Sequence, residues 1–339
     1  MSKIALLPLV TYPEANSTKI VSNAIAVVKH IGAALHALTV NVDIPGISNP
    51  VSRYLINLPE MIRETEATSR KHGLDLLEAL KAEAARVGSP LTTEEIAVQP
   101  ASISDVAATQ SRYFDFSLIG LEPNNQTARM TVDAVLFGSG RPTIILPEGA
   151  NVGAIDHVII AWDGSRVAAR AVADAYEFLQ CAAKITVLTV TSEKPLRDIG
   201  ERLALSLRTR GLPAEGVSID AEDRPIGVTL QERAVGMSAD LLVMGAYGHS
   251  RMRDFVVGGQ PKAFWAICVC LSFCRTRNLQ ICPRVAAASW LLRCANGVKG
   301  TSYAFKTKPC LILVSCGLFR LAHQIHACSH LRASCRPDR

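Results

Sequence analysis

Short apolar runs alternate with longer amphipathic stretches over about the first 150 residues. A short apolar run is typical of a buried strand, and apolar residues that recur every three or four positions favour a helix. The alternation predicts βαβ units built around a parallel sheet. The predicted strands are residues 4–10, 35–44, 95–99, 116–120 and 143–147, and the predicted helices are residues 17–32, 59–87 and 102–112.

The same alternation begins again after residue 154, and the chain repeats itself there. "ADLLVMG" at 239–245 matches "FDFSLIG" at 114–120 at an offset of 125 residues. We interpret the match as an internal duplication, with a first copy at residues 1–150, a second copy at residues 151–261, and a linker around Glu148 to Ala154. In the second copy the predicted strands are residues 155–165, 184–190, 216–221 and 239–245, and the predicted helices are residues 166–180, 195–210 and 226–237.

The expected fold class is therefore α/β, with two tandem doubly wound parallel-sheet domains of the Rossmann-like kind. An irregular tail at residues 262–339 follows them. A helix at 261–274 is the first element predicted there. A lone strand at 308–315 is the candidate for the closing strand of the second copy.

Charge and cysteine content both change where the tail begins. Residues 262–339 hold 12 Lys and Arg against one acid, whereas the residues before them hold 24 basic and 29 acidic residues, so the overall charge of +6 describes neither part. Nine of the ten cysteines also lie in the tail. A shift of the reading frame near codon 260 would account for all of these changes together. No C-x2-C pair or nucleic-acid-binding module stands in the tail, so we expect neither a metal nor a nucleic-acid partner.

The rest of the chain has the features of a cytoplasmic protein. The stretch "MSKIALLPLV" lacks the basic region, long apolar core and cleavage site of a signal peptide. No apolar run reaches the roughly 18 to 20 residues that a membrane helix requires. Cys181 is the lone cysteine before the tail, as is typical of a reducing compartment.

Candidate chemistry gathers in the second copy, at the ends of predicted strands. Asp163 follows the first strand of that copy, and open α/β sheets bind ligands just beyond the carboxyl ends of their strands. Gly245, Gly248 and Gly258 form the pattern G-x2-G-x9-G after the last strand. Glycine lets a ligand approach the main chain closely, and the amino end of a helix favours phosphate. Between the glycines, His249 and Arg251 offer further polar contacts.

These residues resemble the nucleotide-binding members of the universal stress protein family, through "AWDGS" at 161–165 and "GAYGHSRMRDFVVGG" at 245–259. The resemblance implies an adenine nucleotide alpha hydrolase-like fold and a site for ATP, ADP or AMP, with or without Mg²⁺. It implies that Asp163 and the main chain near Val190 face the adenine and ribose, while the glycines surround the phosphates. The full set of expected contacts is Asp163, Val190, Met244, Gly245, Gly248, His249, Arg251, Gly258 and Gly259.

Two departures from the family pattern affect the expected site. Gly259 stands where the family has Ser or Thr, which removes one hydrogen bond to phosphate at a cost of about 1.5–3 kcal/mol. In the first copy, Val10 and Thr11 stand where the Asp is expected, and Pro123 follows in place of a second glycine. We therefore interpret the first copy as a packing partner with a degenerate nucleotide site.

Three functions remain open from the sequence. The first is a stress-response sensor or regulatory module that binds an adenine nucleotide, without assigned catalytic residues. The second is an adenylating or nucleotide-hydrolysing enzyme on the same fold, although the Ser/Gly-rich phosphate loop usual after the first strand is missing. The third is an interaction scaffold that binds no nucleotide. Association either as a homodimer or through intramolecular pairing of the two copies is compatible with the pattern.

Overall fold

The computed structural model describes residues 2–46, 57–191, 199–221, 224–245 and 266–269. In the first copy the elements are β1 (Ile4–Val10), α1 (Lys19–His30), β2 (Ala34–Val42), α3 (Leu58–Val87), β3 (Leu91–Val98), the short 3-10 helix η1 (Pro100–Ser102), α4 (Ile103–Ser111), β4 (Phe116–Leu121), α5 (Gln126–Gly138) and β5 (Pro142–Pro147). They are followed by β6 (His157–Ala161), α6 (Arg166–Asp174), α7 (Tyr176–Cys181), β7 (Lys184–Thr191), α8 (Ile199–Thr209), β8 (Ala214–Asp220), α9 (Ile226–Gly236), β9 (Leu241–Gly245) and β10 (Ala266–Val269).

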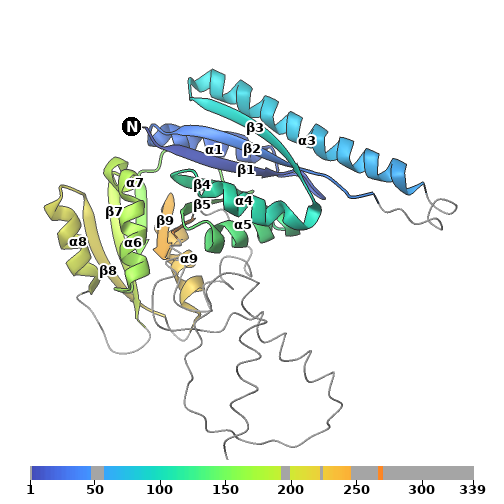
Figure 1. Cartoon of the computed structure of the whole chain (residues 1–339). Coiled ribbons are helices and arrows are strands. Elements are labelled where there is room, and N and C mark those ends of the chain that lie inside the picture. Colours follow the sequence, from blue (N-terminus) through green and yellow to red (C-terminus); the bar gives the residue numbers. More distant parts are fainter. Residues whose placement is uncertain (1, 47–56, 192–198, 222–223, 246–265, 270–339) are drawn as a thin grey trace, which may run out of the picture. The chain divides into compact units, whose positions relative to one another are not determined.

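The first copy is a parallel sheet with helices on both faces, as the alternation predicts. Its strand order is β3-β2-β1-β4-β5, and every neighbouring pair is parallel. Helices α1 and α3 cover one face, and α4 and α5 cover the other (Figure 1). The chain therefore winds outward in both directions from β1, which places a reversal of strand order between β1 and β4.

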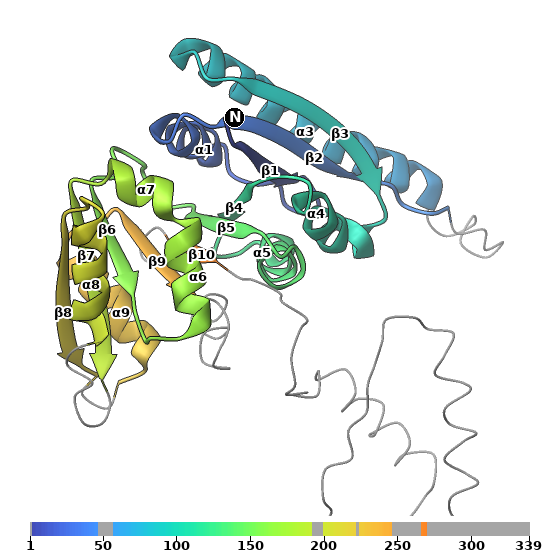
Figure 2. The same cartoon turned by 60° about the vertical axis from the view of Figure 1, so that its left-hand side comes forward.

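The second copy repeats this arrangement with four parallel strands in the order β8-β7-β6-β9. Helices α6, α7 and α8 supply apolar residues to one face, while α9 packs on the other (Figure 2). β10 pairs with β9 in parallel and with β5 in antiparallel orientation. It thus takes the place beside β9 that β5 takes beside β4.

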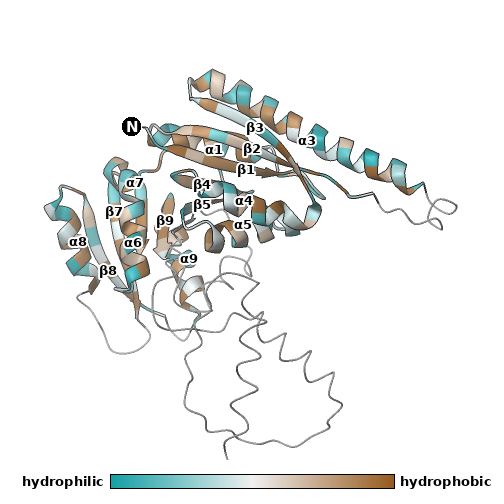
Figure 3. Ribbon diagram, in the orientation of Figure 1, coloured by the Kyte–Doolittle hydropathy of each residue, from teal (hydrophilic) through white to brown (hydrophobic). Residues whose placement is uncertain are grey.

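The central strands of both sheets, such as β1 and β9, are apolar on both faces because helices cover each side. In β1, Leu7 and Leu9 join the core under α1 and α3, whereas Leu6 and Val10 face Ile103 of α4. Apolar residues run along β1 and β9 in the hydropathy view (Figure 3). Continuous burial of this kind is what makes these strands recognisable as short apolar runs.

A matched pair of carboxylates supports the duplication. Asp115 precedes β4, and its Oδ2 accepts a hydrogen bond from the main-chain N–H of Ile4 at 2.8 Å. Asp240 precedes β9, 125 residues later, and its Oδ2 accepts from the N–H groups of Asp156 and His157 at 3.0 and 2.9 Å. In each copy the same aspartate therefore ties the start of the fourth strand to the start of the first.

Two elements of the first copy differ from the sequence prediction. β3 begins at Leu91, four residues before the predicted strand, because it is an edge strand in which exposed polar residues alternate with partly buried ones. Helix α5 was not predicted. Its start is marked by Asn125, whose side chain accepts a hydrogen bond from the N–H of Ala128 at 2.9 Å, as a helix cap does.

Two predictions in and beyond the second copy are corrected. The helix expected at 166–180 is two helices, α6 and α7, separated at Ala175. The helix expected at 261–274 is wrong for Ala266–Val269, which form β10. β10 lies next to β9, in the position that the prediction gave to residues 308–315, and residues 308–315 themselves lie outside the described part of the chain.

The linker between the copies is fixed to α1 by a buried side chain. Asn23 donates from Nδ2 to the carbonyl of Ala150 and accepts at Oδ1 from the N–H of Val152, both at 3.0 Å.

Among the described helices, none has an apolar stretch of the length needed to span a bilayer.

Candidate functional site

The carboxyl ends of three neighbouring strands meet at one edge of the second sheet. β6 lies between β7 and β9, with Ala161 opposite Leu188 and Ile160 opposite Val243. From β6 the chain passes to β7 on one side, and it returns through α9 to β9 on the other. The strand order thus reverses at β6, which is where open α/β sheets form a ligand crevice.

Asp163 lies at this edge, in the turn that joins β6 to α6. Its side chain is exposed, and Oδ1 accepts a hydrogen bond from the N–H of Ser165 at 2.8 Å. Gly164, with φ of +74°, occupies the left-handed region that favours glycine. Ser165 then caps α6, because its Oγ accepts from the N–H of Ala168 at 3.2 Å. The segment is therefore a capped turn that presents a carboxylate beside the amino end of a helix.

Gly245 ends β9 directly against that helix. A Cβ at this position would lie 2.8 Å from the carbonyl carbon of Val167 and 2.9 Å from the nitrogen of Ala168. These are backbone atoms in the first turn of α6, so they cannot move aside as a flexible side chain would. Only glycine lets β9 approach α6 this closely, and the approach brings the start of the glycine-rich segment to the amino end of α6.

Val190 and Met244 occupy the flanking strands. Val190 is partly buried near the end of β7 and packs against the core that includes Leu230 of α9. Met244 is 1% exposed, and its side chain belongs to the same core. Only the main chain of Met244 is therefore available to a ligand at this edge. The remaining predicted contacts, Gly248, His249, Arg251, Gly258 and Gly259, lie outside the described residues.

At the corresponding edge of the first copy, polar side chains form hydrogen bonds with one another and with the main chain. Thr11 follows β1 and is 1% exposed; its Oγ1 donates to the carbonyl of Val40 at 3.0 Å and lies 2.7 Å from Oγ of Ser69. Ser69 in turn accepts a hydrogen bond from the N–H of Val42. The polar groups at the ends of β1 and β2 are thus hydrogen-bonded to one another.

A buried carboxylate stands at the amino end of α1. Glu122, two residues after Gly120, is 8% exposed and accepts from the N–H of Ser17 at 2.9 Å and from Nδ2 of Asn16 at 3.0 Å. A helix amino end favours such a negative charge. Burial nevertheless raises the pKa of Glu122, and its hydrogen bonds with Asn16 and Ser17 only partly offset this effect. The sequence prediction missed both Glu122 and Asn16.

Comparison with known proteins identifies the architecture. No family model and no curated protein matches the sequence. Among solved structures, a universal stress protein from Archaeoglobus fulgidus is similar with a TM-score of 0.55 and 14% identity, and the match covers 78% of this chain and 98% of that one. The chain has the universal stress protein fold.

Two further structures with this fold match less well. A putative universal stress protein from Pseudomonas aeruginosa has a TM-score of 0.45 and 14% identity, covering 79% of this chain and 93% of that one. A protein of the universal stress protein family from Burkholderia pseudomallei has a TM-score of 0.27 and 19% identity, covering 33% of this chain and 96% of that one. The fold is assigned from the Archaeoglobus structure.

The expected Asp and the first expected glycine lie at the carboxyl ends of two adjacent strands, β6 and β9. Asp163 comes three residues after Ile160, Gly245 comes two residues after Val243, and Ile160 and Val243 are opposite one another. Within the described part of the chain, no group of three or more His, Cys, Asp or Glu side chains is arranged to hold a metal ion. The described site therefore offers a carboxylate, a helix amino end and closely packed main chain.

Proposed function

We propose that the second copy binds ATP or a related adenine nucleotide and that the protein acts as a stress-response sensor or regulatory module. The observation that carries this proposal is the approach of Gly245 to the first turn of α6, beside the Asp163 turn. A strand end, a helix amino end and a carboxylate then share one edge at the reversal of strand order. Such an edge suits a ligand with a hydroxylated sugar and phosphates.

The roles follow the chemistry of each group. The free carboxylate oxygen of Asp163 would accept hydrogen bonds from ribose hydroxyls, because its other oxygen already accepts from Ser165. The main chain after Gly245 and the amino end of α6 would face the phosphates, where partial positive charge stabilises an anion. Gly248, Gly258 and the residues between them are proposed to complete this cradle.

The first copy supplies an internal contrast that supports assigning the ligand to the second. There the edge carries the Glu122 carboxylate, which already accepts the N–H of Ser17 at the amino end of α1. A phosphate at that position would be repelled by the carboxylate of Glu122. The N–H of Ser17 would also be unavailable to it, because Glu122 already accepts that hydrogen bond. We therefore propose one nucleotide per chain, with the first copy as a packing partner.

Calorimetric titration of ATP, ADP and AMP into the purified chain, with and without Mg²⁺, tests the proposal. We expect saturable binding that an Asp163→Ala variant weakens by about tenfold or more, because a hydrogen bond to a charged group is lost. Asp75→Ala is the matched control, since Asp75 is exposed on α3 of the first copy. Equal affinities in the Asp163→Ala variant and the wild type, or no binding at all, would overturn the proposal.

A further inference from the structure

A groove with a volume of about 530 Å³ follows α1, where this helix meets the end of α3 and the linker between the copies. Ser22, Ile25, Ala26 and Lys29 of α1 line it at intervals of three and four residues, so they share one face of the helix. Seven residues separate Ser22 from Lys29, so the groove extends about 10 Å along α1. Its volume is within the range of small-molecule sites. We call it the α1 groove.

The walls of the α1 groove include apolar side chains from three segments. α1 contributes Ile25 and Ala26, α3 contributes Val87, and the linker contributes Val152. Ala26, Val87 and Val152 are each partly exposed, so each offers apolar surface to a ligand. The linker wall is held in place, since the N–H of Val152 donates to Oδ1 of Asn23 at 3.0 Å. A wall that is already formed limits the entropic cost of binding.

One positive charge at the α1 groove has no ion-pair partner. Arg86 and Glu83 line the groove and neutralise each other: Nε and Nη2 of Arg86 donate to the two carboxylate oxygens of Glu83 at 2.8 and 2.6 Å. These hydrogen bonds lower the pKa of Glu83, and Lys29 is near enough to add to this effect. Lys29 nevertheless forms no ion pair with any residue in the described part of the chain. His30 also lines the groove, but burial lowers its pKa, so it adds no charge at neutral pH.

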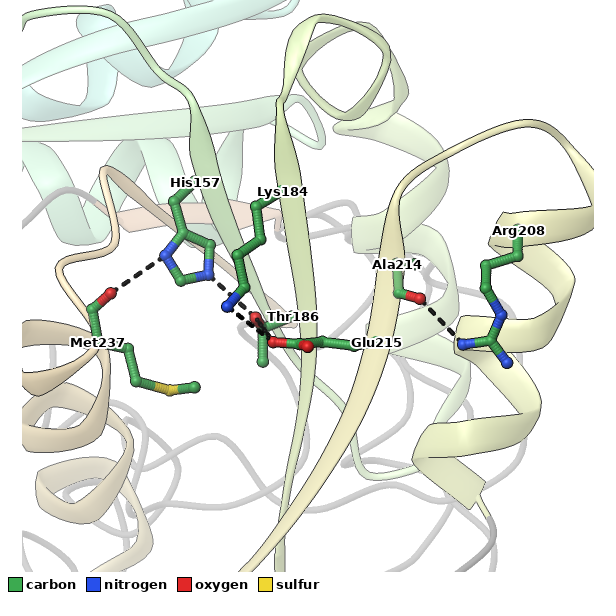
Figure 4. A network of polar contacts seen from close by, with 7 residues as sticks. All are labelled: His157, Lys184, Thr186, Arg208, Ala214, Glu215 and Met237. Carbon is green, nitrogen blue, oxygen red and sulfur yellow. Dashed lines mark hydrogen bonds and ion pairs between the residues drawn. The ribbon is translucent and has the colours of Figure 1, made fainter.

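Lys184 in the second copy provides a contrast. Its ammonium lies 2.9 Å from Oε1 of Glu215, which also accepts a hydrogen bond from Thr186 (Figure 4). The contact belongs to a polar network that crosses the starts of β6, β7 and β8. The charge of Lys184 is therefore balanced within the protein, whereas Lys29 is exposed and can pair with an anion from outside.

The carboxyl end of α1 does not require the charge of Lys29 either. Free carbonyl groups give a helix carboxyl end a partial negative charge. Here the carbonyl of Val28 accepts from the N–H of Ala33 at 2.8 Å, and the carbonyl of Lys29 accepts from the N–H of Gly32 at 3.2 Å. Main-chain N–H groups thus cap the end of α1, and the Lys29 ammonium is not needed as a cap.

We propose that the α1 groove binds a small amphipathic carboxylate, whose apolar body lies on Ala26, Val87 and Val152 and whose carboxylate pairs with the ammonium of Lys29. A single carboxylate matches the single unpaired charge, whereas a phosphate would add a further negative charge beside Glu83. Lys29 lies near the end of α1, which leads back to the start of β2. The α1 groove is therefore separate from the proposed nucleotide site, and its ligand contacts the linker that joins the two copies.

Calorimetric titration of octanoate, a carboxylate with an apolar chain, into the intact protein tests the proposal. We expect saturable binding that Lys29→Gln weakens roughly threefold to tenfold, because the ion pair is lost. Ala26→Phe should also weaken binding, since the larger side chain fills part of the groove. Lys19→Gln is the matched control: Lys19 is exposed on the same helix and does not line the groove, so its loss should leave the affinity unchanged.

Octan-1-ol separates recognition of the carboxylate from contact with the apolar walls. It has the same apolar chain without the charge, and we expect it to bind roughly threefold to tenfold more weakly than octanoate. The proposal is overturned if octanoate shows no saturable binding, if Lys29→Gln and Lys19→Gln bind octanoate equally, or if octan-1-ol binds as tightly as octanoate.

Discussion

Asn16 donates its side-chain N–H groups to both carboxylate oxygens of Glu122, with Nδ2 3.0 Å from each oxygen. The two residues are 106 positions apart in the chain, and both are almost completely buried. Asn16 also accepts the main-chain N–H of Val10 at 2.7 Å. The pair therefore links the end of β1 to the end of β4. This edge of the first copy corresponds to the edge of the second copy that carries the candidate site.

This burial predicts an unusual pH dependence for Glu122. Its pKa is raised in the folded protein, so ionisation opposes folding: the stabilising effect of the protonated form is present below the unfolded value of 4.5 and is lost as pH rises through the raised folded value. Chemical denaturation from about pH 4 to 7 should therefore show that wild type loses free energy of unfolding relative to Glu122→Gln. The slope of that difference is at most about 1.4 kcal/mol per pH unit. A flat or opposite difference would contradict this account of the site.

Replacing Gly245 with Ala should destabilise the second copy. The added Cβ would meet main-chain atoms of Val167 and Ala168 at less than 3.0 Å, so β9 and α6 must separate. We expect a loss of about 1–3 kcal/mol in the free energy of unfolding, measured by urea denaturation. Gly236→Ala is the control, because a Cβ there meets no atom within 4 Å. Equal stability of the Gly245→Ala variant and wild type would show that the close approach does not hold.

Variants can separate the proposed binding role of Asp163 from its hydrogen bond within the turn. Asparagine retains an oxygen that accepts from the N–H of Ser165, but it lacks the charge, whereas alanine lacks both. We expect Asp163→Asn to keep wild-type thermal stability while weakening ATP binding. Asp163→Ala should lower both, with a stability loss of about 1 kcal/mol for the lost turn contact. If Asp163→Asn binds ATP as wild type does, the aspartate serves the turn alone.

The linker contact of Asn23 is also testable. Alanine at this position leaves the carbonyl of Ala150 and the N–H of Val152 without the partner they have in the wild type. We expect a loss of about 1–3 kcal/mol in the free energy of unfolding. Ser22→Ala, on the exposed side of α1, should change it by less than about 0.5 kcal/mol. A similar small effect for both variants would mean that the linker is not held by Asn23.

The sequence predicts the fold well where burial is continuous. β6 and β9 are apolar runs because helices cover both faces of the sheet, and the match of residues 239–245, which contain β9, to residues 114–120 identifies the duplication. Edge strand β3 was underestimated because its exposed Thr92 and Glu94 do not resemble a buried run. β10 was mistaken for a helix because a short apolar run has no period of its own; its extended form comes with pairing to β9 and β5.

The part of the candidate site that lies at the ends of strands was predictable from the sequence. Asp163 and Gly245 follow apolar strands directly, so their meeting at one edge follows from a parallel sheet with the usual strand order. The Asn16–Glu122 pair was not predictable, since nothing local in the sequence indicates that these two side chains meet. The contacts of Thr186 with His157 and Glu215 were missed for the same reason, because the three residues lie on three different strands.

The central claim is that one adenine nucleotide binds at the second copy. It is tested most directly by photolabelling the intact chain with an azido-ATP probe and mapping the labelled peptides. We predict labelling of peptides that contain residues 155–165 or 241–260, which an excess of unlabelled ATP suppresses and which falls in Asp163→Ala. Label that maps to residues 1–150, or label that unlabelled ATP does not suppress, would contradict the claim.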